Sequence, residues 1–98
     1  MIIFTAQAEK TAVIKELVGA VSAQAGVSSG KMYQEVMQRE AAFAPVIIPG
    51  LALPHAKLDV KRPWIAISVN PKGYIYSEET VEPVYLTILL ISPKDKPE

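Results

Sequence analysis

The segment Val84–Ile91 constrains the fold of this chain more than any other, because it is apolar on both faces of a strand. Successive side chains of a β-strand point to opposite faces, so a strand with one face in water alternates apolar and polar residues. A nearly continuous apolar run is typical of a strand in the middle of a sheet. The segment therefore predicts a central strand, and such a strand needs a covering layer on each face.

Two amphipathic helices are predicted in the first half of the chain. Apolar residues recur at helical spacing over residues 7–25, and Gly26 is a natural left-handed stop for that helix. A second helix can be capped by Ser28 or Ser29 and should end at about residues 39–42, before prolines break the pattern. Both helices carry one apolar face that must be buried.

Short apolar runs separated by turn residues occupy the second half of the chain. Leu51–Leu53 is predicted as a strand that Pro54 ends, because proline has no N–H group for the ladder. Trp64–Val69 is predicted as another strand, and Asn70–Gly73 as the turn after it. Tyr74–Tyr76 continues the turn as a short strand.

The order of these elements, two helices and then strands, predicts an α/β or α+β layered domain. We find no internal repeat and no linker, so residues 1–98 are predicted to form a single domain. The chain ends at Pro93–Glu98, directly after the segment expected to be most buried, and two helices are too few to cover both faces of a sheet. We therefore expect a domain that is truncated or is completed by another chain.

Composition argues against several classes of function. Ten Lys and Arg residues balance ten Asp and Glu residues, whereas nucleic-acid binding needs clustered basic charge. The apolar runs are far shorter than the ~20 residues that cross a bilayer, and the N-terminal residues lack the basic flank of a secretory signal. The chain has no cysteine, which excludes disulfides and thiolate sites. We expect a cytoplasmic protein that neither binds nucleic acid nor inserts into the membrane.

His55 is the only histidine of the chain, and it directly follows Pro54. A neutral imidazole is a good nucleophile and can carry a phosphoryl group on either ring nitrogen. The proline fixes the backbone before the ring, which favours precise aim. The alternative is a structural histidine bonded to backbone, and most histidines do no chemistry. With no second histidine or cysteine to share a metal, no metal site and no cofactor are predicted.

A resemblance to a known family favours the chemical role. Arg39–Glu40 lies near the end of the second helix, and it precedes the run Gly50–His55 at a separation that resembles the family's. The stretch Met32–Asn70 resembles the fructose/mannitol/nitrogen-regulatory type (type 2) of enzyme IIA in the bacterial phosphoenolpyruvate-dependent phosphotransferase system. Prolines, a glycine and two strands downstream also fall where the family has them: Pro63, Trp64–Val69, Pro71, Gly73, Pro83-Val84 and Ser92-Pro93.

The resemblance implies a mixed β-sheet flanked by helices, of which this chain would hold the N-terminal two thirds. It makes His55 the phosphoryl acceptor and Arg39 the residue that stabilises the phosphate. The alternative for Arg39 is a solvated cation at a helix C-terminus. Glu40 is expected to be a structural residue of the helix end. Asp59 is close enough in sequence to orient the imidazole, but a surface carboxylate is the expected role.

Two departures from the family pattern bear on the site. Members often carry Ser-Thr-Gly or Pro-Thr in the loop after Arg-Glu, where hydroxyl and N–H groups can approach the phosphate. This chain has Ala44–Pro49 there, without a hydroxyl. Members also often carry another histidine after the last strand, beyond the point where this chain ends. The family domain is about half as long again, which agrees with the expected truncation.

The leading interpretation is a phosphocarrier, a phosphotransferase component that receives phosphate on His55 from an HPr-type protein. It would pass the phosphate to the enzyme IIB component of a sugar permease, or use it to regulate a transporter or regulator, as nitrogen-type members do. The alternative is an enzyme IIA-like regulatory or interaction domain that carries no phosphate. A third possibility is an unrelated domain with a structural histidine. A docking patch near His55 would draw on apolar side chains that are otherwise expected in the core: Ile47, Ile48, Leu51 and Leu53.

Overall fold

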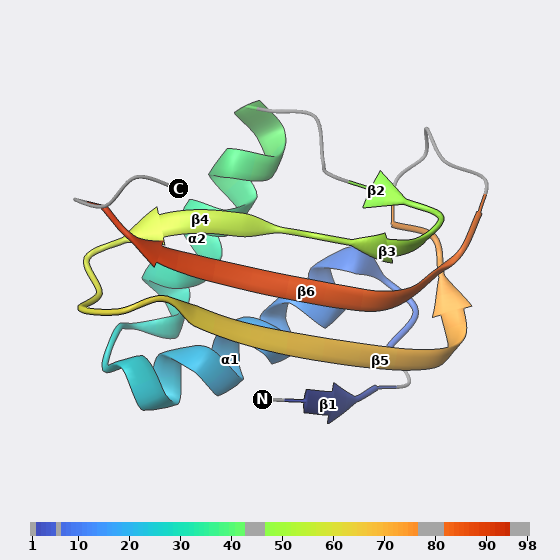
Figure 1. The fold of residues 1–98 in the computed structure, drawn as a ribbon, viewed down its shortest axis with the longest axis horizontal. Coiled ribbons are helices and arrows are strands. Elements are labelled where there is room, and N and C mark those ends of the chain that lie inside the picture. Colours follow the sequence, from blue (N-terminus) through green and yellow to red (C-terminus); the bar gives the residue numbers. More distant parts are fainter. Residues whose placement is uncertain (1, 6, 43–46, 77–81, 95–98) are drawn as a thin grey trace.

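The computed structural model of the chain describes residues 2–5, 7–42, 47–76 and 82–94, and it contains two helices and a six-stranded sheet (Figure 1). The elements follow one another as β1 (Ile2–Phe4), α1 (Lys10–Ala25), α2 (Ser29–Ala42), β2 (Ile47–Ile48), β3 (Gly50–Ala52), β4 (His55–Leu58), β5 (Trp64–Tyr74) and β6 (Val84–Pro93). The predicted class, a mixed sheet with helices packed on it, is confirmed.

Strand β6 lies in the middle of the sheet, as its apolar sequence predicts. It pairs antiparallel with β5 on one side, and on the other side parallel with β3 and then with β4. Strand β1 adds parallel to β5 at one edge, and β2 adds antiparallel to β3 at the other. Strands β3 and β4 thus run along the same side of β6, one after the other, because β3 pairs with its first half and β4 with its second (Figure 1).

The sequence did not predict β4, because Pro54 was expected to end the ladder. Proline removes an N–H donor, but its carbonyl remains an acceptor. The amide of Leu90 donates to the Pro54 carbonyl oxygen at 3.0 Å, and pairing with β6 resumes at once with His55 opposite Leu90. Short edge strands β1 and β2 were also not predicted. The partner of β1 is β5, which is distant in sequence, so no local pattern marks β1. Strand β2 has only 2 residues and pairs with the adjacent β3, too short a segment to stand out as a strand in the sequence.

The expected turn at Asn70–Gly73 is instead an irregular part of β5. The strand runs through to Tyr74, and its register against β6 shifts between Val69 and Tyr74. Gly73 adopts φ 76°, and its amide donates to the Asn70 Oδ1 atom at 3.1 Å. Turn-forming residues here produce a bulge, which bends the strand without ending it.

Both helices form close to their predicted positions. Gly26 ends α1 in the left-handed conformation (φ 74°), with its amide bonded to the Ser22 carbonyl at 3.1 Å. The Ser28 side chain accepts from the Lys31 amide at 3.2 Å and so caps α2. Helix α1 starts at Lys10, three residues later than expected. A tertiary contact accounts for the difference, because the Asn70 amide group holds the Gln7 carbonyl at 2.6 Å.

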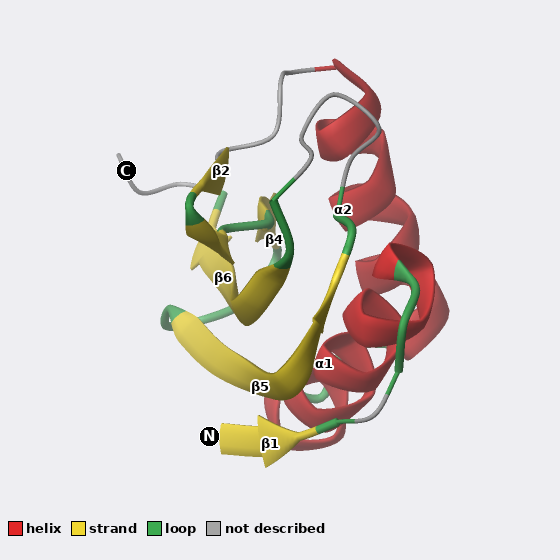
Figure 2. Cartoon of the chain, turned by 90° about the vertical axis from the view of Figure 1, so that its right-hand side faces the viewer, coloured by secondary structure: helices red, strands yellow, loops and turns green. Residues whose placement is uncertain are grey.

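The two helices lie on the same face of the sheet (Figure 2). The core lies between this helical layer and the sheet. Alternate residues of β6 and its neighbours enter this core, among them Ala52, Ala56, Leu58, Ala66, Leu89 and Ile91. The other face carries no helix in the described part of the chain and leaves large apolar side chains exposed: Ile2, Phe4, Ile48, Ile65 and Leu86. Within the described residues, helices therefore cover one face of the sheet only, and the sequence had indicated that two helices are too few for both faces. No described helix is long and apolar enough to cross a membrane.

Candidate functional site

His55 is the first residue of β4, a strand that, among the strands of the described residues, pairs only with β6. Side chains of β4 alternate between half-buried and buried, so Ala56 and Leu58 enter the core while His55 and Lys57 lie on the opposite side. The imidazole is half-buried, next to Leu90 across the ladder, which in turn lies opposite Ile65. The ring therefore lies on the face of the sheet that the helices leave open.

The backbone next to His55 favours one tautomer of its neutral ring. The Nδ1 atom lies 3.3 Å from the carbonyl oxygen of Leu53. A carbonyl oxygen can only accept, so this long hydrogen bond requires the proton to be on Nδ1. In the neutral ring the lone pair is then on Nε2. Pro54 lies between the two bonded residues, and its ring restricts the backbone that joins them.

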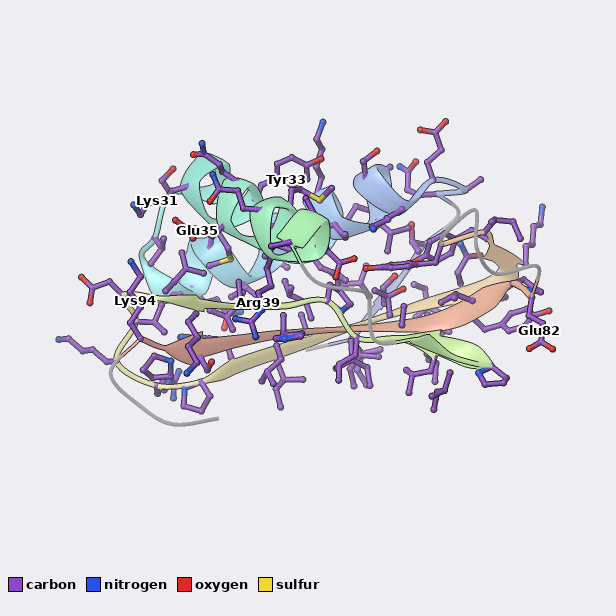
Figure 3. The ribbon with its side chains drawn as sticks, turned by 90° about the horizontal axis from the view of Figure 1, so that it is seen from above. Lys31, Tyr33, Glu35, Arg39, Glu82 and Lys94 are labelled. Atoms are coloured by element: carbon purple, nitrogen blue, oxygen red, sulfur yellow. The ribbon has the colours of Figure 1, made fainter. Side chains whose placement is uncertain are left out.

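Arg39 lies in the last turns of α2 and reaches the edge of the sheet at β4 (Figure 3). It lines a cleft of 240 Å³ together with Glu35, Gln38, Ala56 and Lys57. Two of these residues, Ala56 and Lys57, directly follow His55 in β4. The structure thus brings Arg39 to the strand that carries His55, although the histidine is not among the residues lining this cleft.

Lys57 is a cation of this site that sequence reasoning missed. It is two residues beyond His55, so both side chains leave the same side of β4, and it shares the cleft with Arg39. In a predicted strand, the alternation of side chains would have put Lys57 on the same face as His55, but no strand was predicted after Pro54. The cleft holds two basic residues and one acidic residue, a combination that suits an anionic group.

Glu40 turns away from the cleft and into the protein. Its carboxylate oxygen Oε1 accepts a hydrogen bond from the Tyr76 hydroxyl at 2.7 Å and forms an ion pair with Lys10 Nζ at 2.9 Å. The expected structural role of Glu40 at the helix end agrees with these contacts. Burial, strengthened by the bond to Glu40, raises the pKa of Tyr76 far above its usual range, so the hydroxyl remains a donor.

The remaining candidates fall outside the centre of the site. Asp59 is exposed beyond the far end of β4, where it lines a separate cleft with Arg62 and Trp64, so the surface role is the better description. Leu51 and Leu53 were expected in the core, but both are half-buried, and the buried residue is Ala52 between them. Side chains of a strand alternate between its two faces, and here Ala52 points into the core while the two leucines point to the other face.

The loop that departs from the family pattern is described only in part. Residues 43–46 and the side chain of Ile47 lie outside the described residues. Ile48 is 55% exposed, and it pairs with Leu51 at the edge of the sheet. Among the residues that the structure describes, no group of His, Asp and Glu could hold a metal ion.

Comparison with known proteins places the chain in a family. Residues 1–98, the whole chain, match the family described as "Phosphoenolpyruvate-dependent sugar phosphotransferase system, EIIA 2". The chain belongs to this EIIA type 2 family. The resemblance seen in the sequence is thereby confirmed. Among curated proteins there is no significant match.

A solved structure has the same fold. The EIIA type 2 chain superposes on the nitrogen regulatory protein IIA-Ntr from Neisseria meningitidis with a TM-score of 0.83 and 18% sequence identity. The superposition covers 96% of this chain and 65% of that one. The chain therefore spans about two thirds of the length of the relative, and at this identity the likeness establishes the fold.

Proposed function

We propose that this EIIA type 2 chain is a phosphocarrier, in which His55 receives a phosphoryl group from an HPr-type protein. The phosphoryl group then passes to an enzyme IIB partner or regulates a transporter or regulator. One observation carries the proposal: the Leu53 carbonyl holds Nδ1 of His55, which leaves Nε2 as the nucleophile. The exchange would take place in the cytoplasm between soluble partners.

The transfer step balances with the groups of the two proteins alone. The P–N bond of the donor phosphohistidine breaks, and its electron pair returns to the donor nitrogen. The Nε2 lone pair of His55 forms the new P–N bond. The ring keeps its Nδ1 proton and becomes cationic, and the Leu53 carbonyl stabilises that charge. Arg39, with Lys57 beside it, would offset the negative charge of the phosphoryl oxygens.

A second function is favoured by one feature of the sequence. The loop Ala44–Pro49 offers no hydroxyl to the phosphoryl group, unlike many family members. A chain that has lost phosphate binding would remain an interaction domain of a transporter or regulator, with the same fold. The exposed Ile48 at this edge would then serve contact with a partner.

The experiment incubates the full chain with phosphoenolpyruvate, enzyme I and HPr, and reads the intact mass. The phosphocarrier function predicts one acid-labile phosphate per chain, absent in His55→Ala. Arg39→Ala should slow the labelling by about a hundredfold, the scale of losing one charge-stabilising donor. A folded wild-type chain that takes up no phosphate, beside an enzyme IIA that does, would leave the interaction domain as the function.

A further inference from the structure

A partly buried polar cluster joins the end of α2 to two other parts of the fold. Glu40, whose side chain is 6% exposed, meets Lys10 from the first turn of α1 and Tyr76 from the segment after β5. Both partners bind the same oxygen, Oε1, at 2.9 Å and 2.7 Å. The Lys10 ammonium also lies 4.6 Å from the centre of the Tyr76 ring. Each of the three side chains therefore contacts the other two.

The cluster continues into the core of the sheet. The rings of Tyr76 and Tyr74 lie 6.1 Å apart, and the Tyr74 hydroxyl bonds to the hydroxyl of Thr87 in β6. Both tyrosines are buried: 4% of the surface of Tyr74 and 3% of that of Tyr76 is exposed. A carboxylate in such surroundings is costly unless it is paired and hydrogen-bonded. Its partners therefore fix Glu40 in one position.

Glu40 and Arg39 are consecutive residues of the same helix. Neighbouring residues of a helix point about 100° apart, which follows from 3.6 residues per turn. When Glu40 is held toward Lys10 of α1 and toward Tyr76, Arg39 is directed toward β4 and its cleft. Helix ends are the parts that fray, and α2 ends two residues later at Ala42. An anchor at Glu40 thus determines the orientation of Arg39.

We propose that Glu40 is a positioning residue, which holds the last turn of α2 so that Arg39 meets the phosphoryl group at His55. This inference rests on the proposed phosphocarrier function. In this role Glu40 makes no contact of its own with the phosphoryl group. It acts through Arg39, and Lys10 and Tyr76 act through Glu40.

The test measures single-turnover phosphoryl transfer from phosphorylated HPr to the full chain, as a function of HPr concentration. Glu40→Gln keeps an acceptor for Tyr76 but loses the ion pair with Lys10. We expect it to lower the maximal rate about tenfold, the scale of losing a supporting contact. The HPr concentration at half-maximal rate should stay unchanged, because the docking surface is intact. Tyr76→Phe, which keeps the ring, should lower the rate in the same way.

A double-mutant cycle separates positioning from a general loss of structure. In an Arg39→Ala background, Glu40→Gln should change the rate by less than about twofold, because the group it positions is gone. A merely structural role would lower the rate in both backgrounds. The matched control is Lys15→Met, which removes a lysine 5.3 Å from the Tyr33 ring, a pair without a carboxylate, and it should leave the rate unchanged.

The outcomes distinguish the two proposals. A wild-type chain that accepts no phosphate overturns the phosphocarrier function and this inference together. If the wild type is labelled, the inference alone fails when Glu40→Gln transfers at the wild-type rate. It also fails when Glu40→Gln loses activity equally with and without Arg39, or when Arg39→Ala transfers normally.

Discussion

The amide of Leu90 donates a 3.0 Å hydrogen bond to the carbonyl oxygen of Pro54, so β6 bridges the break between β3 and β4. Proline has a backbone carbonyl but no N–H group, and this contact uses only the carbonyl, so no ladder hydrogen bond is lost there. His55 is thereby the first residue of a strand with a defined register, opposite Leu90. The candidate nucleophile is held by the sheet.

Replacing Pro54 by alanine should have a small effect on stability. Alanine keeps the carbonyl that Leu90 uses, and the main loss is the restriction that proline places on the unfolded chain. We expect Pro54→Ala to lower the free energy of unfolding by about 1 kcal/mol or less. Urea denaturation followed by circular dichroism measures it. A loss several times larger would mean that the ring itself supports the break between the strands.

Gly73 should not tolerate a side chain. Its φ of 76° disfavours other residues, and an added Cβ would lie 2.9 Å from both Pro83 and Tyr85. Gly73→Ala should lower the free energy of unfolding by about 2 kcal/mol or more. Gly19→Ala is the matched control, since it lies within α1 with nothing within 4 Å. It should stabilise the protein by about 0.5–1 kcal/mol. Equal effects of the two substitutions in urea denaturation would contradict the bulge geometry.

Alkaline pH should destabilise the protein through its buried tyrosines. Burial, assisted by the nearby charge of Glu40, raises the pKa of Tyr74 to about 12. A raised pKa means that the folded state keeps its proton longer than the unfolded chain, in which tyrosine titrates at about 10. This contribution to stability is complete below about pH 10 and is lost as the pH rises toward 12.

Urea denaturation across that range should give a slope of up to about 1.4 kcal/mol per pH unit for each such tyrosine. Tyr76, whose pKa is also raised by burial and by Glu40, acts in the same direction. Tyr74→Phe should make the stability of the protein less dependent on pH in this range. An identical alkaline slope in Tyr74→Phe and wild type would show that Tyr74 is not the group that titrates.

The two faces of β6 should differ in their tolerance of truncation. Leu89 is fully buried under the helices, whereas Leu86 is 39% exposed on the open face. Leu89→Ala should cost about 2–5 kcal/mol of unfolding free energy, because it leaves a cavity in a packed core. Leu86→Ala should cost about 1 kcal/mol, since less apolar surface returns to water. Thermal unfolding of both variants tests this prediction. A larger loss of stability in Leu86→Ala than in Leu89→Ala would contradict the assignment of the core to the face that carries Leu89.

The open face should bind apolar dyes. Phe4 is 74% exposed and Ile65 54%, and the side chains opposite them, Val69 and Leu90, are only half-buried. Large exposed apolar patches on a protein are uncommon. The double variant Phe4→Ser and Ile65→Thr should lower the fluorescence of a bound hydrophobic dye. Ile75→Thr, similarly exposed but paired with Glu9, should change it little. Dye fluorescence that stays at the wild-type level in the double variant would show that this face is not the site that binds dye.

Local patterns predicted those parts of the fold that depend on local interactions. The helices over residues 10–25 and 29–42 follow from apolar spacing, from Gly26 and from the Ser28 cap, all within one or two turns of the chain. The central place of β6 follows from its composition. The later start of α1 did not follow, because it depends on a contact between Asn70 and Gln7, 63 positions apart.

By itself, the sequence determined the two helices, the central strand and the resemblance to type 2 enzyme IIA, and it predicted His55 and Arg39 as site residues. Only the tertiary structure decided that both helices cover the same face of the sheet. It also decided that strand pairing resumes at His55 after Pro54, and that Lys57 and Arg39 line one cleft. The ion pair of Lys10 with Glu40 and the hydrogen bond of Tyr76 to Glu40 likewise depend on the tertiary structure. The physical reason is the range of the interactions: periodicity and capping act between neighbours, whereas strand pairing and buried polar contacts join residues that only the folded chain brings together.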